Sequence, residues 1–543
     1  MFKFPVLVLA TFFLIFLDSA HGEEHPNEQT KSMTQYVQTK RLEISLTSLN
    51  KYINKWFILS INGKRNLNLH IQNRYPKTPL TLTKNGIGFF TEDREYTPYH
   101  CNLWDRRSFK KLRKQIRNFA ETYLPICEGR LYVRVNRPAN TQLSFTESAT
   151  KLLRKTEIGE SFINTFKPYI VSMMAESPSE GEYIEQVDQK QVEELDGAPL
   201  EPRMRLDNNM KYDNEHFVGI KLESENTALE YGKWYETKMH TGIFVGLFKP
   251  GLIHPEVIRV DRHKANAITT DEKQMRVYMT AYDLEMYAPE YTVGTEEPKI
   301  TNPELKDKLV PIGSIPPYDL SQSVGVFIGG FKSRHGKINR GPYKGKTYGF
   351  IEKGVELSKM SSGLATAYLK YDGSFHVEKW PEHHTMQKNL SKEVIAARQN
   401  GVMLIDNYRI GRFVNNWGHG NWSGSAERSL KTMRSGICIQ EKGSKRFLIF
   451  MAFMAATPST MAQTMQAFDC KTAMHLDMNA YMYMHNAIYT YEPQKGYEVE
   501  YLNTEMKYPK NLKRHRYIMD NNSRDFFYLK RRKTSNTHYL GTR

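Results

Sequence analysis

Three patches of this 543-residue sequence combine polar or charged side chains with predicted strand ends. Residues 329–336 (GGFKSRHG) contain small residues that allow close backbone approach, and Arg334 and His335 could reach an anion or a proton. Arg434 has a planar guanidinium that suits bidentate phosphate binding. Residues 475–479 (HLDMN) place the Asp477 carboxylate between an imidazole and an amide. Such side chains are suited to anion binding and proton transfer.

Each patch also has a purely structural interpretation. Residues 329–336 could form an ordinary basic turn, and Arg434 could be a surface residue or a member of a structural ion pair. Asp477 could simply cap the end of a strand. Taken one at a time, each patch is compatible with a structural role and with a functional one.

The elements around Asp477 can be predicted from hydrophobic periodicity. Residues 447–455 indicate a buried strand, Thr457 and Pro458 a helix start, and residues 473–477 a second strand. A long helical connection implies that the two strands are parallel neighbours. Asp477 would then lie at the carboxyl end of a strand, where α/β proteins usually place ligand-contacting groups.

Other elements follow from turn and capping signals. Residues 364–371 and 374–380 flank an Asp-Gly dipeptide that is typical of a two-residue hairpin turn. A helix is predicted over residues 109–123, behind the possible caps Asp105 and Ser108. A second helix is predicted over residues 144–166. We therefore expect an α+β protein: a strand-rich, mixed-sheet C-terminal domain with short helices, after a smaller mixed α/β N-terminal domain.

The chain divides by composition into five parts. Residues 1–22 indicate a secretory signal peptide, with a basic start, an apolar run and small residues at its end. We expect an N-terminal domain over residues 23–172, an acidic linker over 173–211, a larger domain over 212–507 and a basic tail over 508–543. The apolar run is shorter than the roughly 20 residues that span a bilayer, and no later transmembrane segment is expected. The protein should be exported, to the periplasm or the extracellular space.

The net charge indicates the kinds of partner that the protein could bind, and the cysteine content indicates its disulfides and metal sites. The net charge of +17 favours anionic partners, and the basic tail could touch an acidic glycan or an envelope surface. Export and the lack of a known nucleic-acid motif argue against a nucleic-acid partner. The four cysteines predict two disulfides, most economically Cys101–Cys127 and Cys438–Cys470 among three pairings, although buried free thiols are an alternative. The sequence contains no CxxC pair, the spacing that would indicate a zinc site. It indicates no other metal site and identifies no cofactor.

The order of these patches resembles that of the phosphodiester glycosidase family over about residues 242–489. Residues 329–331 (GGF) are similar to the family's Asn-Gly-Gly-Phe segment, residues 434–437 (RSGI) to its Arg-Thr-Ala-Ile-Gly strand, and residues 457–477 to the helix and strand before its Asn-Leu-Asp-Gly-Gly-Gly-Ser loop. Three positions depart from the family: Ile328 replaces the first Asn, His475 replaces the Asn before Leu-Asp, and residues 478–481 (MNAY) replace Gly-Gly-Gly-Ser.

The resemblance implies an exported hydrolase that cleaves a sugar-phosphodiester or related anionic envelope glycan linkage. Asp477 would stabilise oxocarbenium character, and Arg434 would bind phosphoryl oxygens with help from Arg334 or Arg398. The remaining roles would fall to the proton donors His335 or His475, to Asn479 orienting a sugar hydroxyl, and to the backbone at Gly329 and Gly330.

A protein without catalytic activity is the main alternative. Because side chains replace the family's glycine-rich loop, the same scaffold could instead serve a glycan-binding or envelope-assembly protein. A secreted nuclease would need a second acid/base or metal constellation, which the sequence does not show.

Overall fold

The computed structural model describes residues 33–50, 52–63, 66–76, 78–89, 99–118, 123–138, 141, 199–205, 211–212, 219–223, 229–422, 430–507 and 515–532. The expected signal peptide, the predicted helix over residues 144–166 and almost all of the expected linker lie outside these ranges. The expected α+β class is confirmed, since sheets dominate and the helices are few and short. Every ladder between described strands is antiparallel, so the described sheets are not mixed as expected.

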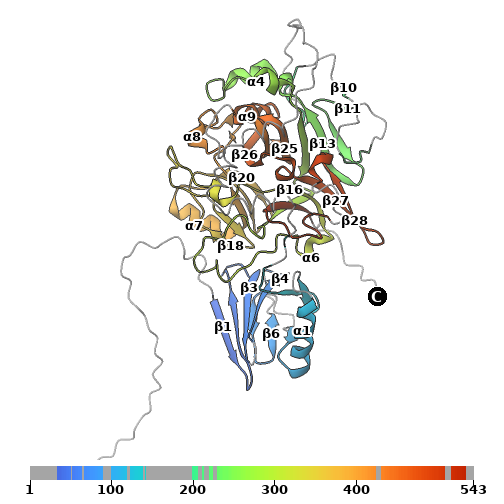
Figure 1. Ribbon diagram of the computed structural model, residues 1–543, viewed down its shortest axis with the longest axis vertical. Coiled ribbons are helices and arrows are strands. Elements are labelled where there is room, and N and C mark those ends of the chain that lie inside the picture. Colours follow the sequence, from blue (N-terminus) through green and yellow to red (C-terminus); the bar gives the residue numbers. More distant parts are fainter. Residues whose placement is uncertain are drawn as a thin grey trace, which may run out of the picture.

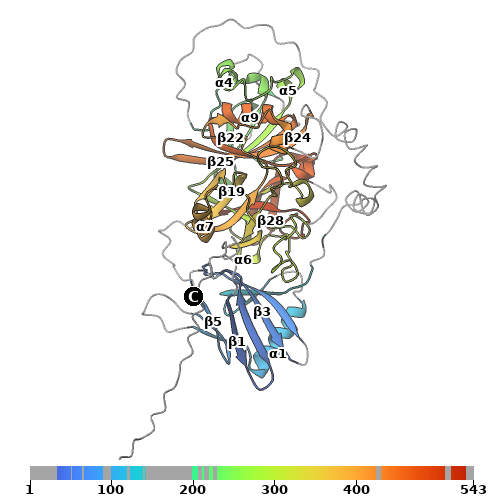
Figure 2. The same ribbon diagram turned by 90° about the vertical axis from the view of Figure 1, so that its left-hand side faces the viewer.

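The N-terminal domain has its own sheets and core, at one end of the molecule in both views (Figure 1, Figure 2). Its six-stranded sheet runs in the order β1 (Met33–Gln38), β2 (Glu43–Ser48), β3 (Trp56–Asn62), β4 (Leu67–Asn73), β9 (Leu131–Val135) and β8 (Leu124–Ile126). A three-stranded sheet joins β5 (Leu80–Leu82), β6 (Gly86–Phe89) and β7 (His100–Asn102).

The first predicted helix is confirmed as α1 (Arg106–Asn118). Asp105 caps it, since its Oδ1 accepts from the backbone N–H groups of Arg107 at 2.9 Å and Ser108 at 3.0 Å. Leu112 and Ile116 bury the apolar face in the domain core. The Cys101–Cys127 disulfide, which closes this region, is confirmed.

The C-terminal domain is built on an eight-stranded sheet and two five-stranded sheets. The eight-stranded order is β12 (Trp234–Thr237), β13 (His240–Phe248), β14 (Val277–Asp283), β25 (Lys445–Ala456), β24 (Thr432–Lys442), β26 (Cys470–Met478), β22 (Ile405–Asp406) and β23 (Arg409–Ile410). One five-stranded sheet contains β15 (Tyr287–Thr292), β29 (Phe526–Arg531), β16 (Ser323–Ile328), β27 (Asn486–Glu492) and β28 (Gly496–Tyr501). The other contains β18 (Val355–Ser358), β17 (Phe350–Glu352), β21 (Val394–Gln399), β19 (Ala365–Lys370) and β20 (Phe375–Lys379).

Short elements connect these sheets. The α-helices are α4 (Pro255–Val260), α5 (Thr270–Gln274), α6 (Pro317–Leu320), α7 (His384–Glu393), α8 (Trp417–Gly420) and α9 (Pro458–Ala467). The 3₁₀ turns are η3 (Pro250–Leu252), η4 (Ser333–His335), η5 (Tyr481–Tyr483) and η6 (Thr504–Met506), and β10 (Lys211–Tyr212) pairs with β11 (Leu229–Glu230). The predicted hairpin is confirmed as β19–β20, with Gly373 at φ 87° in its turn.

The strand, helix and strand predicted before Asp477 are confirmed as β25, α9 and β26, but the prediction that the two strands are neighbours is wrong. Strand β24 lies between β25 and β26 and pairs antiparallel with both, so β25 and β26 are parallel without touching. The cause is the tight β24–β25 hairpin, in which Gly443 adopts φ 58°. The predicted Cys438–Cys470 disulfide joins β24 to β26 and is confirmed.

Part of the basic tail forms a strand inside the C-terminal domain. Strand β29 is flanked by β15 and β16, and Phe526, Phe527 and Leu529 are almost wholly buried. Lys530 forms ion pairs with Glu290 at 2.8 Å and Asp319 at 3.2 Å. These described tail residues therefore stabilise the fold itself.

Candidate functional site

Chain segments from several strands meet beside Asp477, at the end of β26. The backbone N–H of Asp477 donates to the carbonyl of Gly329, just after β16, at 3.1 Å. Gly329 in turn donates to the carbonyl of Asp525, just before β29, at 2.9 Å. Asn400, just after β21, donates from its amide to the carbonyl of His475 at 2.8 Å. The ends of β16, β21 and β26 and the start of β29 are thereby held together.

Two buried ion pairs form the centre of this site. The carboxylate of Asp477 pairs with Nη2 of Arg524, and Oδ2 of Asp525 accepts from Nε of Arg398 at 2.7 Å. Oδ2 of Asp525 also accepts from the Tyr291 hydroxyl at 2.9 Å. We call Asp477, Arg524, Asp525 and Arg398 the carboxylate–arginine cluster. Its two positive charges balance its two negative charges.

The glycines at positions 329 and 330 are required by the close approach of this cluster. A Cβ atom on Gly329 would collide with Oδ2 of Asp525, and one on Gly330 would lie 2.9 Å from Cζ of Arg398. The Gly330 carbonyl accepts from Nη2 of Arg524 at 2.9 Å. Close approach to the backbone does occur at these glycines, but the groups that approach are protein side chains, and a role of Gly329 and Gly330 in substrate binding stays a prediction.

Burial and charge set the protonation of Asp477. Burial raises the pKa of Asp477 to about 6, and the attraction of Arg524 opposes this rise. Burial by itself would lower the pKa of Arg524, but the carboxylates of Asp477 and Asp525 outweigh that effect and raise it. Asp477 can therefore take up a proton near neutral pH while its arginine neighbours stay charged.

Asp477 is also the member of the cluster that reaches furthest towards solvent. Its side chain is 8% exposed, against 1% for both Arg398 and Asp525. Half-buried Lys332 and Tyr483 lie at this end: Nζ of Lys332 is 5.8 Å from the Tyr483 ring centroid, and Cζ of Arg524 is 5.2 Å from it. The exposed edge of the cluster thus combines a carboxyl group with cations and a phenol ring.

Arg434, the expected phosphate ligand, lies in a different environment. It is wholly buried on β24, and its guanidinium donates to the carbonyls of Ala456 at 2.8 Å, Trp422 at 2.9 Å and Leu430 at 3.3 Å. Burial lowers its pKa to about 9. Although β24 and β26 are neighbours, none of these carbonyls belongs to the carboxylate–arginine cluster.

His475 and Asn479 flank Asp477 in sequence, but their side chains contact other parts of the domain. His475 is wholly buried, its ring centroid lies 5.0 Å from that of Phe331, and both ring nitrogens lack a hydrogen-bond partner among the described residues. Burial, with a smaller contribution from Arg434, lowers the pKa of His475 well below its usual range, which favours the neutral ring. Asn479 adopts φ 82°, and its side chain accepts from the Thr432 hydroxyl at 3.1 Å.

The remaining expected site residues lie on η4. Arg334 is exposed and donates from Nε to Nε2 of half-buried His335 at 3.1 Å. The backbone carbonyl of His335 accepts from Asn421 at 2.9 Å. The structure therefore joins Asp477, Gly329, Gly330 and Arg398 in one network, whereas the hydrogen bonds described above for Arg434, Arg334 and His335 are made with other residues.

Sequence reasoning missed Arg524 and Asp525. Both fall in the region interpreted as a basic tail, where single charges attract little notice. A usable signal was present: an Arg-Asp pair stands directly before the apolar run Phe526 to Leu529. Charged residues at the start of a buried strand need partners, and this placement indicates a functional or structural ion pair.

Within the described ranges, no group of three or more His, Cys, Asp or Glu side chains could hold a metal ion. Within the same ranges, no helix is long and apolar enough to cross a membrane. The two disulfides fit an exported protein.

Comparison with known proteins found weak similarity only. No family model and no curated protein matches the chain. The catalytic domain of zebrafish N-acetylglucosamine-1-phosphodiester alpha-N-acetylglucosaminidase, auto-inhibited by its pro-peptide, aligns at 9% identity and a TM-score of 0.30 over 59% of this chain and 88% of its own. A hypothetical Synechocystis protein aligns at 9% identity and 0.29 over 92% and 80%, and a putative exported Burkholderia pseudomallei protein at 8% and 0.23 over 47% and 74%. These TM-scores are too low to assign a fold or an activity.

Proposed function

We propose that the C-terminal domain is an exported hydrolase that cleaves a sugar-phosphodiester or related anionic glycan linkage at Asp477. The observation that carries this proposal is the environment of Asp477: a buried carboxyl group, with a pKa of about 6, paired with Arg524 at the least buried edge of the cluster. Perturbed carboxyl groups beside fixed cations are common in catalytic sites.

The arrangement supplies the main elements that such a reaction needs. Cleavage at the glycosidic carbon builds positive charge on the sugar, which the ionised Asp477 carboxylate would stabilise. The leaving phosphoester carries negative charge, which Lys332 at the exposed edge and Arg524 behind it would support. Water adds to the glycosidic carbon as the bond to the phosphoester breaks, and the ionised Asp477 carboxylate would accept the proton that this water loses. Asp477 therefore replaces the buried, neutral His475 as our first candidate for proton transfer.

A non-catalytic glycan-binding role is favoured by one observation. Arg434, which the family resemblance casts as the phosphate ligand, is wholly buried with its guanidinium on backbone carbonyls. A scaffold in which this arginine is structural could bind an anionic glycan without cleaving it.

The test is release of sugar and phosphomonoester by the purified chain from a panel of sugar-1-phosphate diesters and anionic glycans. We expect turnover by the wild type and its loss in Asp477→Asn, which keeps the size of the side chain but removes its charge and its acidic proton. Asp261→Asn is the matched control, because Asp261 is also buried and also pairs with an arginine, Arg409 at 3.0 Å, outside the cluster.

The outcomes separate the two functions. Turnover that survives in folded Asp261→Asn and disappears in folded Asp477→Asn supports the hydrolase. No turnover by the wild type on any substrate, with glycan binding that survives Asp477→Asn, supports the binding protein. Equal turnover by wild type and Asp477→Asn overturns the assignment of Asp477.

A further inference from the structure

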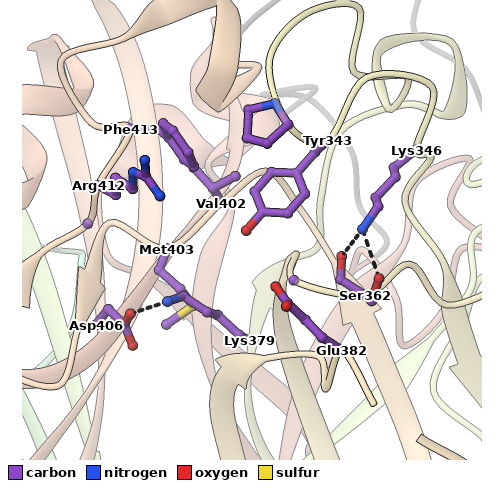
Figure 3. Close-up of a pocket in the computed structure, with 13 residues that line it drawn as sticks. Tyr343, Lys346, Ser362, Lys379, Glu382, Val402, Met403, Asp406, Arg412 and Phe413 are labelled. Carbon is purple, nitrogen blue, oxygen red and sulfur yellow. Dashed lines mark hydrogen bonds and ion pairs between the residues drawn. The ribbon is translucent and has the colours of Figure 1, made fainter. Parts of the chain in front are cut away.

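A separate cavity of about 500 Å³ lies between two sheets of the C-terminal domain (Figure 3). Ligand pockets in proteins occupy roughly 300–1,000 Å³. Lys379, at the end of β20, forms an ion pair across it with Asp406, at the end of β22. This pair links a five-stranded sheet to the edge of the eight-stranded sheet. No residue of the carboxylate–arginine cluster lines the cavity.

Two half-buried aromatic rings form the apolar part of the wall. The rings of Tyr343 and Phe413 lie 6.0 Å apart at an interplanar angle of 86°. Figure 3 shows the Tyr343 ring between Phe413 on one side and Lys346 on the other. Because the two rings are nearly perpendicular, they cannot sandwich a flat base, whereas one ring face can carry the C–H face of a sugar ring.

The polar part of the wall is charged and carries a positive excess. Its cations are Lys346, Lys379 and Arg412, and its carboxylates are Glu382 and Asp406. Burial raises the pKa of the Tyr343 hydroxyl, and Lys379, Glu382 and Arg412 all act on it, which places that hydroxyl among the charges.

The three cations of the cavity wall differ in the hydrogen bonds and ion pairs that they already form. Lys379 is neutralised by Asp406, and Nζ of Lys346 donates to the Ser362 carbonyl at 2.7 Å and hydroxyl at 2.8 Å. Arg412 is exposed, and its Cζ lies 5.3 Å from the Phe413 ring centroid. Among the described residues no carboxylate forms an ion pair with Arg412. Its guanidinium is therefore the group in the wall most able to receive an anion.

We propose that this cavity binds a sugar residue that carries a carboxylate or a phosphate group. The sugar ring lies against Tyr343, its hydroxyl groups bond to Asp406, Glu382 and Lys379, and its anionic group pairs with Arg412. The site is distinct from Asp477 and does not depend on the hydrolase proposal. In an exported protein it would hold an acidic glycan to the domain, whether or not Asp477 cleaves that glycan.

The test is titration of the full mature chain with glucuronic acid, glucose 6-phosphate and neutral glucose, followed by calorimetry or ligand-observed NMR. We expect at least one of the two anionic sugars to bind, and glucose to bind at least about tenfold more weakly. The anion that binds identifies the group as carboxylate or phosphate. Arg412→Glu should weaken anion binding by at least about tenfold, and Tyr343→Ala should weaken binding of all the sugars that bind.

Two controls keep the outcomes separate. Arg262→Glu makes the same change in net charge at another exposed arginine, just after α4, and should leave binding unchanged. Asp477→Asn should also leave it unchanged, so failure of the hydrolase proposal does not affect this one. Absence of binding by both anionic sugars at millimolar concentration, binding that Arg412→Glu and Tyr343→Ala leave intact, or binding lost only in Asp477→Asn would overturn the proposal.

Discussion

Asp477 carries a carboxyl group whose charge is disfavoured by burial more than it is supported by Arg524. This balance distinguishes it from Asp261, whose carboxylate accepts from Ile410, Arg409 and Gln466, so that its pKa is lowered although burial alone would raise it. At the scale of single residues, the number of donors around a buried carboxylate decides whether it is structural or reactive.

The raised pKa of Asp477 predicts a specific pH dependence of stability. Its usual value is 3.8 and its folded value about 6, so the folded protein holds this proton more tightly than the unfolded chain does. That contribution, about 3 kcal/mol, is fully present below about pH 4 and is lost as the pH rises through about 6. Urea unfolding of wild type and Asp477→Asn across this range should show a smaller decline in the variant. Parallel pH profiles would contradict the assigned pKa.

Arg434 should prove to be a structural residue. Its guanidinium satisfies carbonyls from three chain segments in a buried site, and a lysine cannot replace this planar set of donors. We expect Arg434→Lys to lower the free energy of unfolding by about 3 kcal/mol. Chemical denaturation measures this, with exposed Arg262→Lys as the control. A variant as stable as wild type would contradict this prediction.

Sequence reasoning reached part of this site and missed the rest for a physical reason. It grouped Gly329, Gly330, Arg398 and Asp477, because their order along the chain follows a family pattern. It could not supply Arg524 and Asp525, since which charges pair inside a core depends on where a distant strand inserts. It also could not show that Arg434 points to carbonyls, because that depends on the loops around residues 422, 430 and 456.

At the scale of elements, hydrophobic patterns predicted β25, α9 and β26 but not their neighbours. The helix is buried along its entire length, and two of its polar side chains donate to backbone carbonyls: Thr464 to that of Thr460 at 2.8 Å, and Gln463 to that of Asn266 at 2.9 Å. Hydrophobic periodicity could not predict the order of the strands in the sheet. The β24–β25 hairpin places β24 between β25 and β26, the two strands that α9 connects.

The Cys438–Cys470 disulfide should stabilise this arrangement. It ties β24 to β26 and closes a loop of sequence separation 32 that contains β25 and α9. In the chain-entropy model, removing such a cross-link costs about 2–4 kcal/mol. Unfolding of Cys438→Ser/Cys470→Ser measures this cost, with Cys101→Ser/Cys127→Ser as a comparison in the other domain. An unchanged midpoint would contradict it.

At the scale of the whole molecule, the C-terminal segment completes the fold and the site together. Strand β29 joins β15 to β16, and the residues directly before it are Arg524 and Asp525. The expected domain end near residue 507 did not anticipate this, because the apolar run Phe526 to Leu529 can indicate a strand but not the sheet that the strand joins. Contact of residues 508–514 or 533–543 with an envelope surface stays a prediction.

Two truncations test the role of β29. A chain ending at residue 532 keeps the strand and should unfold at the wild-type temperature. A chain ending at residue 507 loses the strand and two of the four residues of the cluster, Arg524 and Asp525, and it should lose cooperative unfolding of the C-terminal domain. Calorimetry distinguishes the two. A cooperative transition for that domain in the shorter chain would show that β29 is dispensable.

The central claim is that Asp477 carries the chemistry of the C-terminal domain. The most direct measurement is the pH dependence of sugar release from a sugar-1-phosphate diester by wild type and Asp477→Asn, between about pH 4 and pH 8. The claim predicts turnover by wild type with an inflection near pH 6, where the carboxyl group of Asp477 titrates, and at least about a hundredfold less turnover by the folded variant. Equal rates and equal pH profiles for the two proteins would contradict it.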